Sequence, residues 1–505
     1  MNRWYLWLAC MAGLPVVAAA QDTTTARPPA GAGLSLAEAL STAKANSPTY
    51  RQTLNDAGPA RWGVRSAYGA LLPQADVSLG LGYTGSGNSN FGGTTFSQTS
   101  PSYNSSYGIG LQMQISGRVL SGLGQAKALA RATDADMGAA AADLRRSITT
   151  QYLQTLQAGA QVDVARQQVS RNEDFLKLAQ ARYQVGQATL LDVRQAEVTK
   201  GTSEVTLLRA IQTESEAKLE LFRRMGVASP VAVDQVRLTD SFPVTAPDFK
   251  LDELLAMAAE QNPALRAVQA RQSAASAAVS GAKSQFFPTL SISAGWNGYT
   301  QQFTNESLLM GQALSGAQSQ YQSCLDNNTI RSSAGLSTNP DCLGSAGLLS
   351  SSELQPDVVS GIRSSNNVFP FNFTRQPFSA RLTISLPIFT GFSRHLQLAQ
   401  ARAQEEDAEE SVRARGLQVR TDVQGRFLAL ETAYRTIAVQ QASRDAAREQ
   451  LRLAQDRYRL GSGTALELSD AQNAIQRAEG DYVNAVYSYH IAIADLELAV
   501  GRPLR

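Results

Sequence analysis

The sequence is poor in the residues that build catalytic and metal sites. Only two histidines occur among its 505 residues, His395 and His490, and they lie far apart with no cysteine near either. The sequence therefore offers few side chains from which a zinc site or a histidine-based catalytic triad could be built. We expect no catalysis, no metal and no cofactor.

Charge is also sparse. Charged residues make up 17% of the chain, and the formal net charge is only +2. A typical globular protein has about a quarter of its residues charged. Nucleic-acid-binding proteins usually show a clear basic excess. We therefore expect no nucleic-acid partner.

Two short patterns resemble enzyme motifs but lack the required context. Residues 80–85 fit the glycine spacing of a dinucleotide loop, but a Ser/Asn/Gly-rich stretch follows them instead of a helix. Ser41 and Lys44 have the Ser-x-x-Lys spacing of penicillin-recognising enzymes, without the accompanying Lys-Thr-Gly or Ser-Asp-Asn triplet. An acyl hydrolase would require Ser41 to react with an acylating probe, and we expect no labelling.

The first twenty residues have the pattern of a secretory signal peptide. One Arg is followed by an apolar stretch and by three alanines before Gln21, which predicts cleavage after Ala20. Residues 21–35 are rich in Pro, Thr and Gly and are expected to be flexible. Cys10 is an alternative lipidation site, although the apolar stretch before it is short and Trp7 occupies the usual leucine position.

Removal of the signal leaves two cysteines, Cys324 and Cys342, both in the connection 301–377. An even pair in an exported chain predicts a disulfide. Closing such a loop stabilises a fold by about 3 kcal/mol in the chain-entropy model. Two free thiols are the alternative.

The chain contains one helical hairpin sequence twice. Residues 178–192 read LAQARYQVGQATLLD and residues 453–467 read LAQDRYRLGSGTALE, with every matched pair 275 positions apart. Upstream, residues 36–51 match 251–266. Such spacing indicates tandem duplication. We expect a chain of four parts after residue 35, namely a first repeat at 36–226, a linker at 227–250, a second repeat at 251–501 and a short tail at 502–505.

Four segments alternate between apolar and small or polar residues, which predicts strands. They lie at about 74–84, 106–117, 289–299 and 378–388. Their length, their single apolar face and the aromatic residues near their ends are typical of a membrane barrel wall. A soluble β-sandwich shows the same alternation and is the alternative.

Four strands are too few to close a barrel in lipid. Open edges would leave backbone N–H and C=O groups unpaired, and the smallest membrane barrels have about eight strands. Strands that span a membrane must therefore be shared among several chains. The connections 84–106 and 301–377 are rich in Asn and Ser, and we expect exposed loops there.

Long helices are predicted where proline is missing. No proline occurs between Pro101 and Pro230 or between Pro387 and Pro503. Apolar residues there recur at intervals of three and four, which indicates packed helices that are partly coiled coil. A helix from about residue 120 to 185 would be about 100 Å long. The helices turn at the first tip turn (185–189) and the second tip turn (460–464).

The segments Arg182–Ala196 and Arg457–Ala471 follow the pattern R-Y-x-V-G-x-x-T-x-x-D-V-x-x-A, completely in the first repeat and approximately in the second. They resemble the tip of the TolC-like outer-membrane efflux channels, and the resemblance extends over nearly the whole mature chain. It implies a mixed fold, in which a long α-helical barrel in the periplasm joins a 12-stranded β-barrel shared by a homotrimer, with four strands per chain.

The resemblance also implies a function and partners. The expected protein is a passive exit duct that spans the Gram-negative outer membrane and contacts its lipid. The duct would be part of a tripartite efflux system or a type I secretion system. Its partners would be a periplasmic adaptor (membrane fusion) protein and an inner-membrane pump of the RND, ABC or MFS type. The sequence leaves the exported cargo open. The alternative is a non-conducting trimeric structural or adhesin-like envelope protein.

The resemblance assigns a periplasmic gate to four residues. Glu467 and Asp470 match acidic residues that ring the narrow end of the tube, where three copies of each would attract cations and raise the carboxyl pKa values. Asp192 and Tyr458 match two members of a polar lock between neighbouring hairpins. An ordinary solvated helix face is the alternative for these residues.

The third member of that lock is missing. Gly463 stands where the family has an arginine, and the candidates to replace it are Arg457, Arg459 and Arg194.

In the family, the tip turns also dock the adaptor. The matching residues are Val185, Gly186, Gln187, Leu460, Gly461 and Ser462. The two glycines are equally suited to the left-handed backbone of a helix hairpin, and both roles can coexist.

Overall fold

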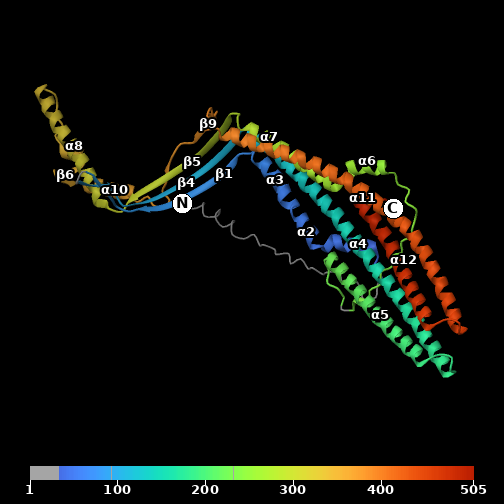
Figure 1. Cartoon of the computed structure of the whole chain (residues 1–505). Coiled ribbons are helices and arrows are strands. Elements are labelled where there is room, and N and C mark those ends of the chain that lie inside the picture. Colours follow the sequence, from blue (N-terminus) through green and yellow to red (C-terminus); the bar gives the residue numbers. More distant parts are fainter. Residues whose placement is uncertain (1–32, 92–93, 231, 505) are drawn as a thin grey trace. The chain divides into compact units, whose positions relative to one another are not determined.

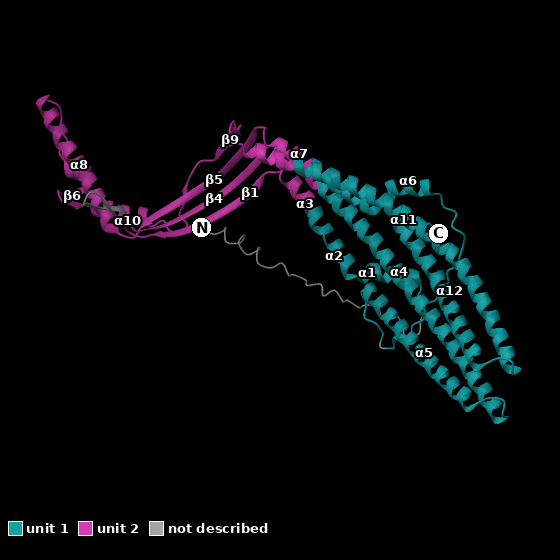
Figure 2. Ribbon diagram, viewed as in Figure 1, with its two compact units in different colours: residues 1–62, 127–276, 402–505 teal, residues 63–126, 277–401 magenta. Residues whose placement is uncertain are grey.

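The computed structural model describes residues 33–91, 94–230 and 232–504. These form two compact units (Figure 2), which are described separately. Unit 1 contains the described residues up to Trp62 together with Lys127–Ser276 and the chain from Arg402 onward, and unit 2 contains Gly63–Ala126 and Ala277–Ala401. The predicted signal peptide, Cys10 and residues 21–32 lie outside the described residues.

Long helices dominate unit 1 (Figure 1). They are α4 (Gly117–Gln184), α5 (Leu190–Met225), α11 (Ser393–Arg459) and α12 (Ala465–Val500), and the first residues of α4 and α11 belong to unit 2. At about 1.5 Å per residue, the 68 residues of α4 extend about 100 Å, which confirms the prediction from the missing prolines. Within the described ranges, no helix combines the length and apolarity that crossing a membrane would require.

Shorter helices precede each long pair. They are α1 (Leu36–Asn46), α2 (Pro48–Asn55) and α3 (Ala57–Gly69) in the first repeat, and α6 (Leu251–Gln261) and α7 (Pro263–Ser284) in the second. Pro48 and Pro263 each begin a helix, because proline lacks the N–H that the first helical turn leaves unpaired anyway. Between the repeats lies a short 3₁₀ helix, η1 (Val233–Gln235).

Each repeat builds its own hydrophobic core from equivalent positions. Ala39 and Ala43 pack with Ile148 and Leu221 in the first repeat. The residues at the same repeat positions pack together in the second repeat, namely Leu254, Ala258, Val423 and Leu496. The packing therefore confirms the tandem duplication that the sequence predicts.

Unit 2 contains an antiparallel sheet. Its strands are β1 (Gln74–Thr84), β4 (Ser102–Ile115), β5 (Thr289–Phe303), β8 (Thr374–Arg375) and β9 (Ser379–Ser385). The strand order is β1-β4-β5, with β9 and the short β8 both paired to β5. The two repeats therefore meet where β4 pairs with β5.

The register places apolar side chains on one face of this sheet. Val77 lies opposite Ile109, and Ile109 lies opposite Trp296. On the other face, Ser78 lies opposite Gly108. Since cross-strand partners share a face, the sheet has one apolar and one small or polar side. Val77 is 79% exposed in the single chain.

The connections 84–106 and 301–377, expected as exposed loops, both contain regular structure. The first holds a hairpin of β2 (Gly87–Phe91) and β3 (Thr94–Thr99). The second holds the helices α8 (Glu306–Ser333), α9 (Cys342–Ser345) and α10 (Pro356–Asn366), and the strands β6 (Leu348–Ser350) and β7 (Glu353–Leu354). The expectation of loops was wrong because Asn and Ser content is only a weak guide to local structure.

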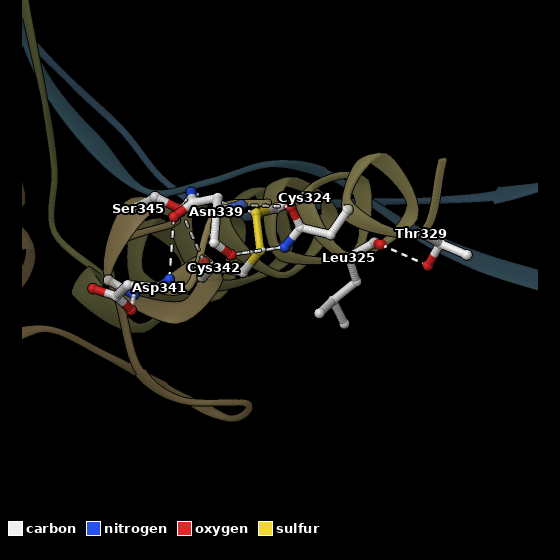
Figure 3. The surroundings of a disulfide bond; sticks show 9 residues. Cys324, Leu325, Thr329, Asn339, Asp341, Cys342 and Ser345 are labelled. Atoms are coloured by element: carbon white, nitrogen blue, oxygen red, sulfur yellow. Dashed lines mark hydrogen bonds between the residues drawn. A yellow bond between two sulfur atoms is a disulfide. The ribbon is translucent and has the colours of Figure 1, made fainter. Parts of the chain in front are cut away.

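The second connection, which we call the insert, has a small core of its own. Ala317, Ala346, Leu348 and Leu354 are buried together there. A disulfide joins Cys324 in α8 to Cys342 in α9, with the two Cα atoms 5.7 Å apart (Figure 3).

Candidate functional site: the two tip turns

The first and second tip turns have the same backbone design. Gly186 and Gly461 adopt φ angles of 75° and 80°, in the left-handed region that favours glycine. The N–H of Gln187 donates to the Arg182 carbonyl at 2.8 Å, and the N–H of Ser462 donates to the Arg457 carbonyl at 3.0 Å. This pattern closes the end of a helix on a C-terminal glycine. Both helical hairpins therefore turn in the same way.

Each tip turn is followed by a capped helix. Thr189 and Asp192 form a capping box, in which the Asp192 carboxylate accepts from the Thr189 N–H and hydroxyl, both at 2.8 Å. In the second repeat, the Thr464 hydroxyl accepts from the Glu467 N–H at 3.1 Å. These caps pair the free N–H groups of the first helical turn. Thr189 with Asp192 thus fixes where α5 begins, and the Thr464 hydroxyl fixes where α12 begins.

One apolar cluster joins the two hairpins near the tips. It contains Phe175, Val193 and Ala196 from the first repeat with Leu451, Tyr458, Leu468 and Ile475 from the second. Tyr458 is 3% exposed, and its ring packs edge-on against Phe175 with centroids 5.6 Å apart. Its repeat equivalent, Tyr183, is 47% exposed. The hairpins are therefore packed asymmetrically on each other.

The predicted lock pair Asp192 and Tyr458 lies close together, but no hydrogen bond joins the two side chains. The buried Tyr458 hydroxyl has no hydrogen-bond partner among the described residues. Burial, and next the charge of Asp192, raise the pKa of Tyr458, while the Arg182 charge lowers it. Asp192 therefore influences Tyr458 through its charge.

Arg182 contacts the second hairpin directly. Its guanidinium lies over the Tyr458 ring, 4.6 Å from the centroid, and donates through Nη1 to the Tyr458 carbonyl. Through Nη2 it donates to the Gln187 carbonyl at 3.1 Å. Arg182 opens the repeated motif but was not among the candidates for the missing lock arginine, which were Arg457, Arg459 and Arg194.

The acidic residues Glu467 and Asp470 are both exposed at the start of α12. Arg457 lies 3.7 Å from Glu467 in an exposed ion pair. Gly463 donates its N–H to the Arg457 carbonyl, and a Cβ atom on Gly463 would lie 3.0 Å from the Arg457 Cβ. A larger residue at position 463 would therefore require its neighbours to shift by a few tenths of an ångström.

The six predicted docking residues are all exposed at the two tips, which lie at the same end of unit 1 (Figure 1). Val185 is 67% exposed and Leu460 is 83% exposed. Each tip turn thus presents an apolar side chain beside a glycine, a feature that suits contact with a partner surface.

Farther from the tips, a partly buried ion pair joins the same two hairpins. Arg171 on α4 donates to the Glu479 carboxylate on α12 at 2.9 Å. Arg171 also donates to Gln168 on its own helix at 3.0 Å. This pair was not predicted from the sequence, because partners in different repeats have no fixed sequence spacing.

A family model described as "Outer membrane efflux protein" matches residues 39–227 and 349–502 of this chain. The matched ranges contain both tip turns and all four long helices. The intervening residues 228–348 include α8 and Cys324 of the insert.

Several solved outer-membrane proteins are similar in structure. The outer membrane protein VceC from Vibrio cholerae is 16% identical with a TM-score of 0.66, over 93% of this chain and 97% of that chain. The CmeC outer membrane channel of Campylobacter jejuni is 14% identical with a TM-score of 0.67, over 92% and 85%. The MtrE outer membrane channel of Neisseria gonorrhoeae, in its open state, is 20% identical with a TM-score of 0.63, over 93% and 89%.

Proposed function

The chain belongs to the outer membrane efflux protein family, and from that membership we propose that it is a passive exit duct gated at its periplasmic tip. Members of this family are outer-membrane channels of tripartite efflux systems. They are homotrimers that work with an adaptor and an inner-membrane pump. A type I secretion system uses the same kind of duct and is included in the proposal.

The incomplete sheet of the single chain is the observation that supports the proposal most strongly. Among the described residues, β1 pairs only with β4, and β9 pairs only with β5. Both edges of the sheet are therefore open, and its apolar face is exposed. Open edges are costly in lipid because each unpaired backbone group loses a hydrogen bond. Three copies, with four main strands each, would close one barrel of twelve strands.

We place the gate at the tip turns. The exposed carboxylates Glu467 and Asp470 would form two acidic rings when three chains surround one axis. Rings of carboxylates favour cations in a narrow pore. Asp192 lies near Tyr458, which is buried where the two hairpins of one chain pack together. Separating the hairpins would widen the tip.

We place adaptor docking at the two tip turns themselves. Val185, Gly186 and Gln187 form one contact, and Leu460, Gly461 and Ser462 form the other. The exposed apolar side chains Val185 and Leu460 support this assignment.

Conductance tests the proposed duct. The purified protein, reconstituted in a planar bilayer, is expected to form cation-selective pores. The double substitution Glu467→Gln with Asp470→Asn is expected to reduce the selectivity, whereas Asp481→Asn, an exposed carboxylate elsewhere on α12, is the control. A trimer that never conducts would favour the alternative of a non-conducting structural or adhesin-like envelope protein.

Binding to a purified adaptor tests the docking site. Val185→Asp and Leu460→Asp are each expected to weaken binding, because a charge would be buried against the adaptor. Leu336→Asp, an exposed position in unit 2, is the control. Unchanged binding in both tip variants would show that the adaptor docks elsewhere.

A further inference from the structure

We propose that Arg182 replaces the arginine that the family's lock would have at Gly463, and that it holds the tip closed by linking the two hairpins of one chain. This inference rests on the proposed gated duct. Arg182 would be a positioning residue, since it acts by fixing the second hairpin.

The contacts of Arg182 connect the two tips. Its guanidinium donates to the Gln187 carbonyl in the first tip turn and to the Tyr458 carbonyl at the end of α11. It also stacks on the Tyr458 ring at 4.6 Å. A planar guanidinium can make such hydrogen bonds and stack on an aromatic face at the same time. Moving the hairpins apart would break the contacts to Tyr458 but not the contact to Gln187.

Gly461 in the second tip turn lies beside the Arg182 side chain. A Cβ atom on Gly461 would lie 3.5 Å from the Arg182 Nη2 atom, which is ordinary contact distance. The φ angle of 80° is therefore the feature of this position that favours glycine, and the guanidinium packs next to it.

The repeat supplies a matched comparison within the chain. Arg457 occupies the position equivalent to Arg182, but it points to its own hairpin, 3.7 Å from Glu467 and 3.4 Å from the Ser462 carbonyl. Its side chain is 59% exposed. Exposed ion pairs of this kind contribute little. Two arginines from one duplicated motif therefore have different environments, and only Arg182 bridges the hairpins.

The test measures closed-state stability in single-channel recordings of the reconstituted full-length protein. Arg182→Ala is expected to raise the open-state occupancy about tenfold, which corresponds to about 1.4 kcal/mol. Arg452→Ala is the control and is expected to leave occupancy unchanged, because this side chain on α11 is 59% exposed and pairs with Glu449 and Asp456 of its own helix. Arg182→Lys keeps the charge but loses the planar stacking, so it should lie between wild type and Arg182→Ala.

The oligomeric state and thermal unfolding of each variant separate gating from folding. A structural role alone would change these properties without the graded order of occupancies. If wild type conducts and Arg182→Ala has the occupancy of wild type, the proposed link is wrong and the duct remains. If Arg452→Ala opens the pore as much as Arg182→Ala, the link is also wrong. If wild type and all variants fail to conduct, the duct itself is wrong.

Discussion

Gly226 packs directly against the main chain of Asn46, where a Cβ atom on the glycine would lie 2.5 Å from the Asn46 carbonyl oxygen. Gly501 repeats this arrangement against Gln261, at 2.4 Å. Both glycines end a long helix in the left-handed conformation, with φ angles of 76° and 93°. Each closes the return helix of its repeat onto a short helix at the beginning of that repeat.

This contact predicts that Gly226→Ala and Gly501→Ala each destabilise the protein by roughly 2 kcal/mol or more, because a side chain meets both a strained φ angle and a main-chain oxygen. Gly425→Ala in the middle of α11 is the control. A Cβ there would meet nothing within 4 Å, and the change should stabilise the helix by up to about 1 kcal/mol. Thermal unfolding followed by circular dichroism measures the effect. Equal midpoints in all three variants would contradict it.

The buried hydroxyl of Tyr458 gives a second prediction. Because this hydroxyl lacks a hydrogen-bond partner among the described residues, Tyr458→Phe should leave stability unchanged or increase it by roughly 1 kcal/mol. Tyr458→Ala should lose roughly 3 kcal/mol or more, since it empties a buried aromatic site. Denaturant unfolding measures both changes.

Tyr458→Phe also distinguishes a gate held by the stacking of Arg182 on the Tyr458 ring from a gate held by a hydrogen bond between Tyr458 and Asp192. The substitution retains the ring under Arg182, so the open-state occupancy of the pore should remain at the wild-type level. A marked increase in occupancy would mean that the hydroxyl makes a hydrogen bond in the closed trimer, as the predicted pairing with Asp192 requires.

The third prediction concerns acid. Hydrogen bonds from Arg223 and Arg224, at 2.6 and 2.8 Å, lower the pKa of Glu220 to about 2. Above the ordinary carboxyl pKa, this group is ionised in both states, and its stabilising contribution is complete. As the pH falls toward 2, the unfolded chain takes up the proton first, and the contribution is lost.

Glu220→Gln should therefore lower the free energy of unfolding near neutral pH by a fraction of a kcal/mol, as for other ion pairs close to solvent. Denaturant unfolding at several pH values measures this difference. The difference from wild type should shrink as the pH approaches about 2. Glu406→Gln, on the exposed surface of α11, is the control. If the stability difference between Glu220→Gln and wild type grows as the pH falls, the carboxyl pKa of Glu220 is not lowered in the folded protein.

The disulfide of the insert gives a fourth prediction. Cys324 and Cys342 are 18 positions apart, and removing such a cross-link costs about 3 kcal/mol in the chain-entropy model. The double change to serine should speed tryptic cleavage after Arg331 in the last turn of α8. Mass spectrometry of the fragments locates the cut. Cleavage at wild-type speed would show that the insert core alone stabilises α8.

The helical part of this fold follows from the sequence, because its signals are local. Missing proline, apolar spacing of three and four residues, and a motif repeated at constant offset all depend on near neighbours. The alternation along the strands is local too, and it separates the face of Val77 from the face of Ser78. The insert was misjudged because α8 packs against residues of β6, β7 and α10, and its local composition does not indicate these contacts.

The sequence by itself determined that the chain is two copies of one hairpin design, with a glycine turn and a capped helix in each. Only the tertiary structure decided which hairpin's arginine contacts the other hairpin. Arg182 and Arg457 have the same motif and the same helix-end position, so no sequence pattern distinguishes them. The offset packing of the hairpins buries Tyr458 and leaves Tyr183 exposed, and this asymmetry gives the stacking partner to Arg182 alone.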